Sequence, residues 1–346
     1  MERTSNQKRT TIRAARRQRG LPAVLLLLAA MAMAIEFVAA DKGDPPGGEG
    51  VCETEAETKT GARTRPPPRV LLGDTLRDLE DLVSFEEVLL SSGARTPAVA
   101  AAVPGGEAIG LTYVRDLVEP GLSSRLVGAC DARSGWTVSP QSVDGSATVR
   151  EASRTSRSCP LIWPQLYLPL LDDPAYASRL DPLREEIGLA WGLTQRFGDL
   201  LGVGEETVEP LQLVRYRQGE FYKEHHDHGS YYGADTEQRP WTLLVYLSDA
   251  PGGGERGGQT FFRALGGAGG VSVVPRRGDG VLWRNEDAAT GELLEEAVHE
   301  AVPPEGGTEN EHEHEHENAS VKYAMNVWIA KKKIMEHMDV SAYRTQ

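Results

Sequence analysis

One short motif with a distant partner limits what this 346-residue chain can fold into: His225-x-Asp227, followed much later by His299. In a β-strand, side chains two positions apart point the same way, so His225 and Asp227 share a face that His226 does not. A fold that also brings His299 to this face would place two imidazoles and one carboxylate together. The pattern therefore predicts a three-ligand metal site.

The segments on either side of the motif predict strands. Residues 211–216 alternate in polarity, and residues 241–247 are rich in β-branched and aromatic side chains. The intervening residues 225–230, His-His-Asp-His-Gly-Ser, would also suit a solvated polar turn. A lone His-x-Asp has a high false-positive rate, so the motif alone leaves both interpretations open.

The chemistry of the three side chains indicates which metal they would suit. Two histidines and a carboxylate can occupy one face of an octahedral Fe(II) and leave the opposite face open for a bidentate co-substrate and dioxygen. Lys322 follows the last of these side chains and supplies a cation that could hold the far carboxylate of a dicarboxylic acid. The set predicts an Fe(II)- and 2-oxoglutarate-dependent oxygenase.

Longer blocks of sequence surround these residues and occur in a fixed order. They are residues 211–227, 239–249, 257–262 and 274–285, then His299 with Pro303, and Lys322 with Trp328. As a set they resemble the prolyl 4-hydroxylase family of 2-oxoglutarate oxygenases, both the alpha-subunit type and the plant type. The resemblance covers roughly residues 110–332.

The resemblance implies a reaction and a set of iron ligands. His225, Asp227 and His299 would bind Fe(II). The enzyme would be a dioxygenase of the procollagen-proline 4-dioxygenase type, hydroxylating a peptidyl proline while 2-oxoglutarate is decarboxylated to succinate and CO2. L-Ascorbate would be the reductant, and the substrate a proline-containing polypeptide. No catalytic residue is implied beyond the metal and co-substrate ligands.

The resemblance also implies roles for five further residues. Lys322 would pair with the distal carboxylate of 2-oxoglutarate, and Thr260 and Tyr216 would hydrogen-bond the same molecule. Tyr222 and Arg239 would face the peptide substrate.

Each of these side chains also has an ordinary structural interpretation. Tyr216 would suit an apolar core with a satisfied hydroxyl. Thr260 could be a strand residue after a Gly-Gly turn, and Lys322 a strand-edge lysine that discourages edge pairing. His299 is flanked by glutamates and would also suit a surface. Their joint occurrence in order favours the functional interpretation.

The spacing between His299 and Lys322 is longer than is usual in the family and includes an alternating Glu/His run at residues 311–317. His312, within this run, is therefore a rival for the third ligand. We favour His299, because Val298-His299 with Pro303 fits the family block. An inserted surface loop is expected at about residues 305–319, where the run could bind stray divalent metal weakly.

Charge and hydropathy at the N-terminus differ from the rest of the chain. The net charge is −14, which disfavours nucleic-acid binding, yet the first twenty residues are basic. An apolar run at 21–35 and the small residues Val38-Ala39-Ala40 follow, so residues 1–40 predict a signal peptide or an uncleaved signal anchor. Asn318-Ala319-Ser320 is a glycosylation acceptor. We expect the secretory pathway, either in the lumen of the endoplasmic reticulum or anchored in its membrane and facing the lumen, with membrane contact only through that segment.

The remaining pattern gives the fold class and the domain limits. We expect a low-complexity linker over 41–107 with a short helix in 69–92, an oxygenase domain over 108–335, and a tail over 336–346. Helices are predicted at 120–130 and 180–200. Strands punctuated by Gly-rich turns predict a mainly β fold with flanking helices and a double-stranded β-helix (jelly roll) core.

The three cysteines fit a lumenal protein. Cys130 and Cys159 could pair, with Cys52 left over, although buried thiols are the alternative.

Two other functions fit the same residues. The oxygenase could act on another side chain or a small molecule, or the domain could be a non-catalytic jelly-roll binding module. An intact ligand set with Lys322 argues against the binding module. The sequence indicates no oligomeric partner.

Overall fold

The computed structural model describes residues 68–72, 75–79, 85–89, 95–100, 105–139, 141–143, 146–148, 152–229, 238–305 and 321–336. Of two compact units in the chain, 1–63 and 64–346, the first lies wholly outside these residues. The predicted signal segment, most of the linker, Cys52, the Glu/His run, Asn318 and nearly all of the tail lie outside them too. Among the described residues, no helix combines the length and the apolar character needed to cross a membrane.

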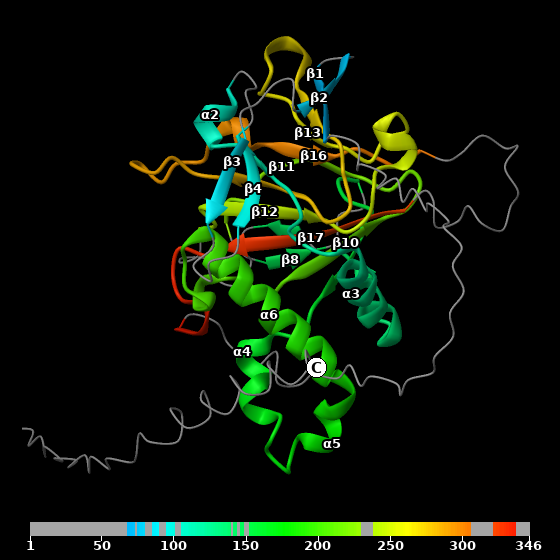
Figure 1. Ribbon diagram of the computed structural model, residues 1–346, viewed down its shortest axis with the longest axis vertical. Helices are drawn as coiled ribbons and strands as arrows, with labels where there is room; N and C mark the ends of the chain where they lie inside the picture. Colours follow the sequence, from blue (N-terminus) through cyan, green and yellow to red (C-terminus); the bar gives the residue numbers. More distant parts are fainter. Residues whose placement is uncertain are drawn as a thin grey trace, which may run out of the picture. The chain divides into compact units, whose positions relative to one another are not determined.

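Two antiparallel sheets dominate the structure (Figure 1). The larger sheet contains, in spatial order, β3 (Phe85–Leu89), β4 (Arg95–Ala100), β5 (Thr112–Val114), β15 (Gly280–Arg284), β12 (Trp241–Tyr246), β17 (Lys322–Ile329), β10 (Gln212–Tyr216), β9 (Arg157–Pro160) and β6 (Thr137–Val138). The smaller sheet contains β11 (Tyr222–His225), β16 (His299–Ala301), β13 (Thr260–Phe262), β14 (Val271–Val273), β1 (Arg69–Leu72) and β2 (Thr75–Asp78). A hairpin of β7 (Gln141–Val143) and β8 (Ser146–Thr148) stands apart.

Strand alternation puts one apolar core between the sheets. Leu244 and Tyr246 of β12 and Trp283 of β15 point inward and meet Phe262 of β13 and Val273 of β14 in one buried cluster. Because side chains alternate between faces, the intervening residues of β12 point the other way. Two facing antiparallel sheets with a shared core confirm the predicted mainly β fold and jelly-roll core.

Helices cover the outer face of the larger sheet. The long ones are α3 (Pro120–Ala132) and α6 (Arg184–Leu201), close to the predicted helices, and α3 begins with a proline at its first turn. Leu126 of α3 and Phe197 of α6 share a buried cluster with Leu243 and Val245, the outward residues of β12. Figure 1 shows both helices on that side of the sheet. The short helices are α2 (Gly106–Ile109), α4 (Pro164–Tyr167) and α5 (Ala177–Leu180).

The predicted helix within residues 69–92 is wrong. This segment contains β1, β2 and β3, and β1 pairs with β14 through Val70↔Val273, while β4 joins β5. The spacing of the leucines is compatible with a helix. Pairing with the edge strands β14 and β5, however, satisfies backbone groups that the ends of a short helix would leave unpaired. Strands before residue 108 are therefore part of both sheets, not of a linker.

A disulfide joins one covering helix to the sheet. Cys130 of α3 is bonded to Cys159 of β9, which decides between the pairing and the buried thiols that the sequence left open.

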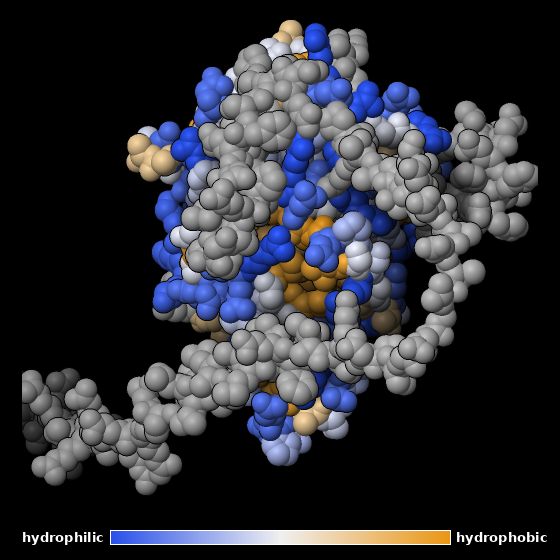
Figure 2. Space-filling view, in the orientation of Figure 1, coloured by the Kyte–Doolittle hydropathy of each residue, from blue (hydrophilic) through white to orange (hydrophobic). Residues whose placement is uncertain are grey.

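Outside the core, the described surface on the face drawn in Figure 2 is mostly hydrophilic, with apolar side chains gathered near its centre.

Candidate active site

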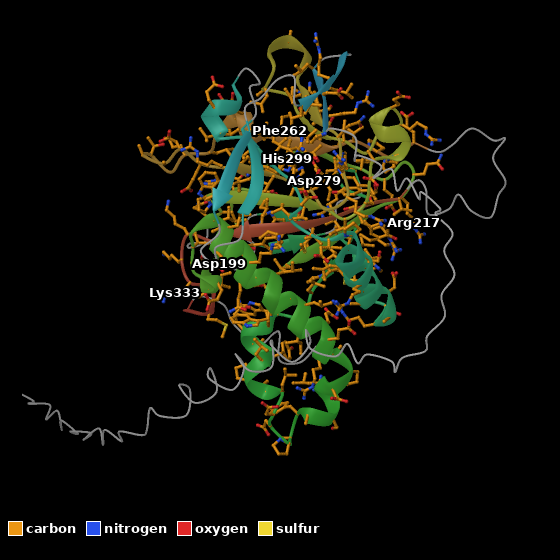
Figure 3. The ribbon with its side chains drawn as sticks, viewed as in Figure 1. Asp199, Arg217, Phe262, Asp279, His299 and Lys333 are labelled. Atoms are coloured by element: carbon orange, nitrogen blue, oxygen red, sulfur yellow. A yellow bond between two sulfur atoms is a disulfide. The ribbon has the colours of Figure 1, made fainter. Side chains whose placement is uncertain are left out.

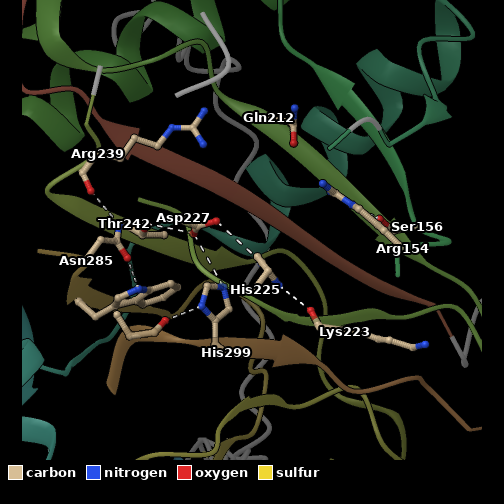
Figure 4. A network of polar contacts seen from close by, with 12 residues as sticks. Arg154, Ser156, Gln212, Lys223, His225, Asp227, Arg239, Thr242, Asn285 and His299 are labelled. Carbon is tan, nitrogen blue, oxygen red and sulfur yellow. Dashed lines mark hydrogen bonds and ion pairs between the residues drawn. The ribbon is translucent and has the colours of Figure 1, made fainter. Parts of the chain in front are cut away.

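The structure brings together the three side chains singled out from the sequence. His225 ends β11 and His299 begins β16, and the two residues are direct partners across these antiparallel strands. Asp227 follows two residues after His225. Ligand atoms of the three lie within 4.8 Å of one another. The Nε2 atoms of His225 and His299 are each 3.8 Å from a different carboxylate oxygen of Asp227 (Figure 4). His226, between them, is exposed.

Backbone carbonyl oxygens fix the orientation of both imidazoles. Nδ1 of His225 lies 2.8 Å from the Lys223 oxygen, and Nδ1 of His299 lies 2.9 Å from the Ala297 oxygen. A carbonyl oxygen only accepts, so both Nδ1 atoms carry the proton and both Nε2 lone pairs face the cluster. Burial, with help from His299, lowers the pKa of His225 well below its ordinary value, which keeps this imidazole neutral.

Asp227 is held as a carboxylate. Burial alone raises its pKa, but His299, His225 and the Arg239 guanidinium lower the pKa by more, so the net shift is downward. Its Oδ2 atom accepts a hydrogen bond of 3.1 Å from the Thr242 hydroxyl. Two aromatic rings pack against the His299 imidazole, with their centroids 5.6 Å (Phe262) and 4.9 Å (Trp283) from its own. Figure 3 marks Phe262 and His299 between the sheets. Two neutral imidazoles and a charged carboxylate are a donor set that suits Fe(II).

Lys322 is a buried cation in the same inter-sheet space. It begins β17 and is 1 % exposed, and burial lowers the pKa of its ammonium to about 7. Its Nζ atom donates to the Gln259 carbonyl oxygen at 3.4 Å, and no acidic side chain of the described residues forms an ion pair with it. A buried ammonium with so little compensation is costly to the fold unless an anion joins it.

Two predicted co-substrate residues lie beside Lys322. Tyr216 of β10 is its direct cross-strand partner, and its ring centroid is 5.4 Å from Nζ. Thr260 follows Gln259 and accepts a hydrogen bond of 3.1 Å from the Tyr246 hydroxyl, which reaches it from the opposite sheet. Tyr246 thus positions Thr260. The sequence around Tyr246 indicates only a core tyrosine on an apolar strand.

Tyr222 stacks on the first histidine. Its ring lies 3.4 Å from that of His225, centroid to centroid, at 14°. The Arg154 guanidinium lies 4.3 Å from the Tyr222 centroid. Arg154 is 5 % exposed and donates to Ser156 and Ser158. The sequence gives Arg154 no site role, because no local pattern marks a single arginine before the predicted strands as buried.

Arg239, which the resemblance places against the substrate, is buried in an ion pair. It is 6 % exposed, and its Nε and Nη2 atoms donate to the two oxygens of the Glu209 carboxylate, at 2.7 and 2.6 Å. The Trp328 ring also lies against it, 3.9 Å from the guanidinium carbon to the centroid. The charge of Arg239 is thus paired with the buried Glu209.

Comparisons with known proteins identify the family of this segment. Residues 211–330 match the sequence model of the 2OG-Fe(II) oxygenase superfamily. Residues 211–330 are a 2OG-Fe(II) oxygenase domain. The segment spans β10 to β17 and includes His225, Asp227, His299 and Lys322. The donor set and the buried cation described above fit Fe(II) and 2-oxoglutarate as the cofactor and co-substrate of such a domain.

Individual relatives are prolyl hydroxylases. The chain is 38% identical to prolyl 4-hydroxylase 1 of Arabidopsis thaliana over 96 residues, covering 23% of this chain and 31% of that protein. It is 33% identical over 99 residues to prolyl 4-hydroxylase subunit alpha-1 of Gallus gallus, covering 27% of this chain and 18% of that protein. The predicted resemblance to this family is confirmed for the oxygenase domain. The chain spans less than a third of the length of either relative.

Among solved structures, the viral collagen prolyl hydroxylase of Paramecium bursaria Chlorella virus-1, a 2OG complex, is 18% identical with a TM-score of 0.37. The likeness covers 64% of this chain and 95% of that one. At that score it adds no weight to the sequence match.

Proposed function

We propose that this protein is a dioxygenase that hydroxylates peptidyl proline at C4, using Fe(II) and 2-oxoglutarate. The observation that carries the proposal is Lys322, a buried ammonium facing the same inter-sheet space as the His225, Asp227 and His299 cluster. A purely structural role would leave a costly uncompensated charge in the core. A bound dicarboxylate supplies the missing anion.

The three clustered side chains would hold the iron. His225 and His299 offer neutral Nε2 lone pairs, and Asp227 offers a charged oxygen. Bound Fe(II) would supply the dioxygen chemistry by which 2-oxoglutarate is oxidised to succinate and CO2 and a substrate C–H bond is hydroxylated. These ligands would cover only part of the metal's coordination sphere and leave room for the co-substrate. L-Ascorbate is the reductant expected with this family.

The co-substrate would bind between the sheets. Lys322 would pair with its distal carboxylate at short range, where water does not screen the attraction. The Thr260 oxygen accepts from Tyr246, so its own proton is free to be donated to the same carboxylate. Tyr216 adds a phenol beside the ammonium. The chain's part in the reaction is thus to orient the co-substrate and to exclude water.

The choice of proline rests on the relatives, which are named as prolyl 4-hydroxylases. Tyr222, half-buried and stacked on His225, is the residue that we place beside the substrate proline. The expected partner is a proline-containing polypeptide.

The test is mass spectrometry of proline-containing peptides incubated with the protein, Fe(II), 2-oxoglutarate and oxygen. We expect a gain of one oxygen on proline, matched by an equal amount of succinate. Succinate without oxidised proline would move the substrate to another side chain or a small molecule. No succinate with any substrate, from protein that is folded, would refute the oxygenase.

We also propose that the protein works in the secretory pathway. The Cys130–Cys159 disulfide supports this, because disulfides persist in oxidising compartments. Expression of the full chain in animal cells tests it. Sensitivity of the product to a glycosidase that removes N-linked glycans, lost in Asn318→Gln, supports the lumen, and an unglycosylated cytosolic product contradicts it.

A further inference from the structure

We infer that Thr242 is a positioning residue for the metal, acting through a hydrogen-bond relay formed with Asn285 and Trp283. The relay holds one oxygen of Asp227, so that the other is the one offered to the metal. This inference rests on the proposed function, because it assigns a role towards the same iron.

Two groups at the end of the relay fix the direction of every hydrogen bond in it. The Trp283 indole N–H can only donate, and it donates to Asn285 Oδ1 at 2.9 Å. The Arg239 carbonyl oxygen can only accept, and it accepts from Asn285 Nδ2 at 3.0 Å. The amide of Asn285 therefore has one orientation, with no flipped alternative of equal quality.

That orientation decides where the Thr242 proton goes. Asn285 Nδ2 also donates to Thr242 Oγ1 at 2.8 Å. With its oxygen occupied as an acceptor, the hydroxyl directs its single proton to Asp227 Oδ2, 3.1 Å away. Figure 4 shows the line from Asn285 through Thr242 to Asp227. A hydrogen bond to a carboxylate is one of the stronger kinds, so it fixes the carboxylate plane as well as its charge.

The relay is buried and held in place by the sheet. The side chains of Thr242, Asn285 and Trp283 are fully buried. Thr242 and Trp283 are direct partners across β12 and β15, so the sheet sets their spacing. The Asn285 backbone is held as well, because its N–H donates to the Pro240 oxygen and its oxygen accepts from Leu294. A buried network with every member satisfied keeps one arrangement.

The relay also connects two of the three candidate ligands. The Trp283 ring that anchors Asn285 stands edge-on to His299, with centroids 4.9 Å apart at 68°. The Trp283 indole therefore bears on the position of Asp227, through Asn285 and Thr242, and also packs directly against His299. Neither connection is visible from the sequence, because the members lie on different strands.

The test compares Co(II) binding by matched variants under anaerobic conditions. Isothermal titration measures the affinity, and the visible spectrum reports the coordination of the bound Co(II). Thr242→Val keeps the side-chain shape and removes the donor. Loss of a partner of this kind commonly weakens metal binding roughly 10- to 100-fold, and we expect a loss in that range with an altered spectrum. Thr242→Ser keeps the hydroxyl and should bind within about threefold of the parent, a loss well below that range.

Thr194→Val is the control, since Thr194 is equally buried but lies on α6, away from the relay. It should bind Co(II) as the parent does. Should Thr242→Val fail to fold, Thr242→Ala supplies a second variant without the donor. A folded donor-free variant with parental affinity and spectrum would overturn the inference, as would a Thr242→Ser protein that loses as much affinity as Thr242→Val. A parent that binds no metal would instead overturn the proposed function.

Discussion

Tyr216 and Lys322 face each other across β10 and β17, and the Lys322 ammonium lies 5.4 Å from the Tyr216 ring centroid. A second ring, that of Tyr246, lies 5.9 Å away. Aromatic faces attract a cation much less strongly than a carboxylate does. The surroundings therefore accommodate the charge without neutralising it, and burial lowers its pKa to about 7.

Replacing Lys322 should weaken 2-oxoglutarate binding. Loss of one partner from a buried charge pair costs roughly 2–5 kcal/mol, so Lys322→Ala should raise the apparent KM for 2-oxoglutarate by about 30-fold or more. Lys322→Arg should restore part of the loss, because it keeps the charge but not the reach. Initial rates of succinate formation measure both. Lys333→Ala, at an exposed ion pair with Glu206, is the control. An unchanged KM in Lys322→Ala would assign the lysine a different role.

The same lysine should make stability depend on pH in the protein free of metal and 2-oxoglutarate. Between about 7, its folded pKa, and 10.5, its ordinary pKa, the unfolded chain binds more protons than the folded one. The contribution of Lys322 to the free energy of unfolding therefore rises with pH by up to about 1.4 kcal/mol per unit, and below pH 7 its burial penalty is full. Lys322→Met should be more stable than the parent at pH 7, by an advantage that shrinks towards pH 10. Urea unfolding at several pH values measures this, and an advantage independent of pH would contradict it.

The strand register predicts which histidines bind metal. Asp227→Ala and His299→Ala should each abolish metal binding and turnover, because each removes one member of the cluster. His226→Ala, from the exposed face of the same segment, should bind metal like the parent, and so should His228→Ala. Metal content after anaerobic loading and gel filtration is the measurement. Loss of metal from a well-folded His226→Ala protein would show that the register is wrong.

Arg239 offers a test between a structural and a substrate role. Arg239→Ala leaves Glu209 as an unpaired buried charge, which commonly costs about 3–5 kcal/mol. We expect a fall of that size in the free energy of unfolding. The double variant Arg239→Met with Glu209→Gln should recover much of it. A stable Arg239→Ala protein with a raised KM for peptide would instead place the side chain against the substrate.

Deleting residues 308–317 separates the two candidates for the third ligand. The deletion removes His312 with the rest of the Glu/His run, which lies outside the described residues, and keeps Asn318. We expect metal binding and 2-oxoglutarate turnover close to the parent, because loop length changes closure entropy by only about 0.6 kcal/mol per doubling. Metal content and succinate formation are the measurements. A folded deletion protein without metal, beside a metal-loaded His299→Ala, would transfer the role to the run.

The site residues were predictable where their signal is local. The two-residue spacing of His225 and Asp227 predicts that they share a face, and Asp227, two residues beyond the end of β11, does meet His225. The alternation of β12 and β17 directs Thr242 and Lys322 inward. Thr242 could not be found this way. Its role depends on Asn285, which is adjacent only because β12 pairs with β15, and pairing between distant strands leaves no trace in a local pattern.

The same limit explains the expectation that differs from the structure. The leucines within residues 69–92 have helical spacing, and only the partner strands, such as Val273 opposite Val70, make the segment extended. It also hides the ion pair of Arg239, because Glu209 lies thirty positions earlier in the chain and meets Arg239 only after folding.

The early strands bear on how this protein can be shortened. A chain that starts at residue 108, where the sequence places the beginning of the oxygenase domain, would lose β1 and β2 from one sheet and β3 and β4 from the other. The backbones of β14 and β5 would then have unpaired N–H and C=O groups along their full length. Such edges template intermolecular pairing, so the shortened protein would tend to aggregate even with every metal and co-substrate residue intact.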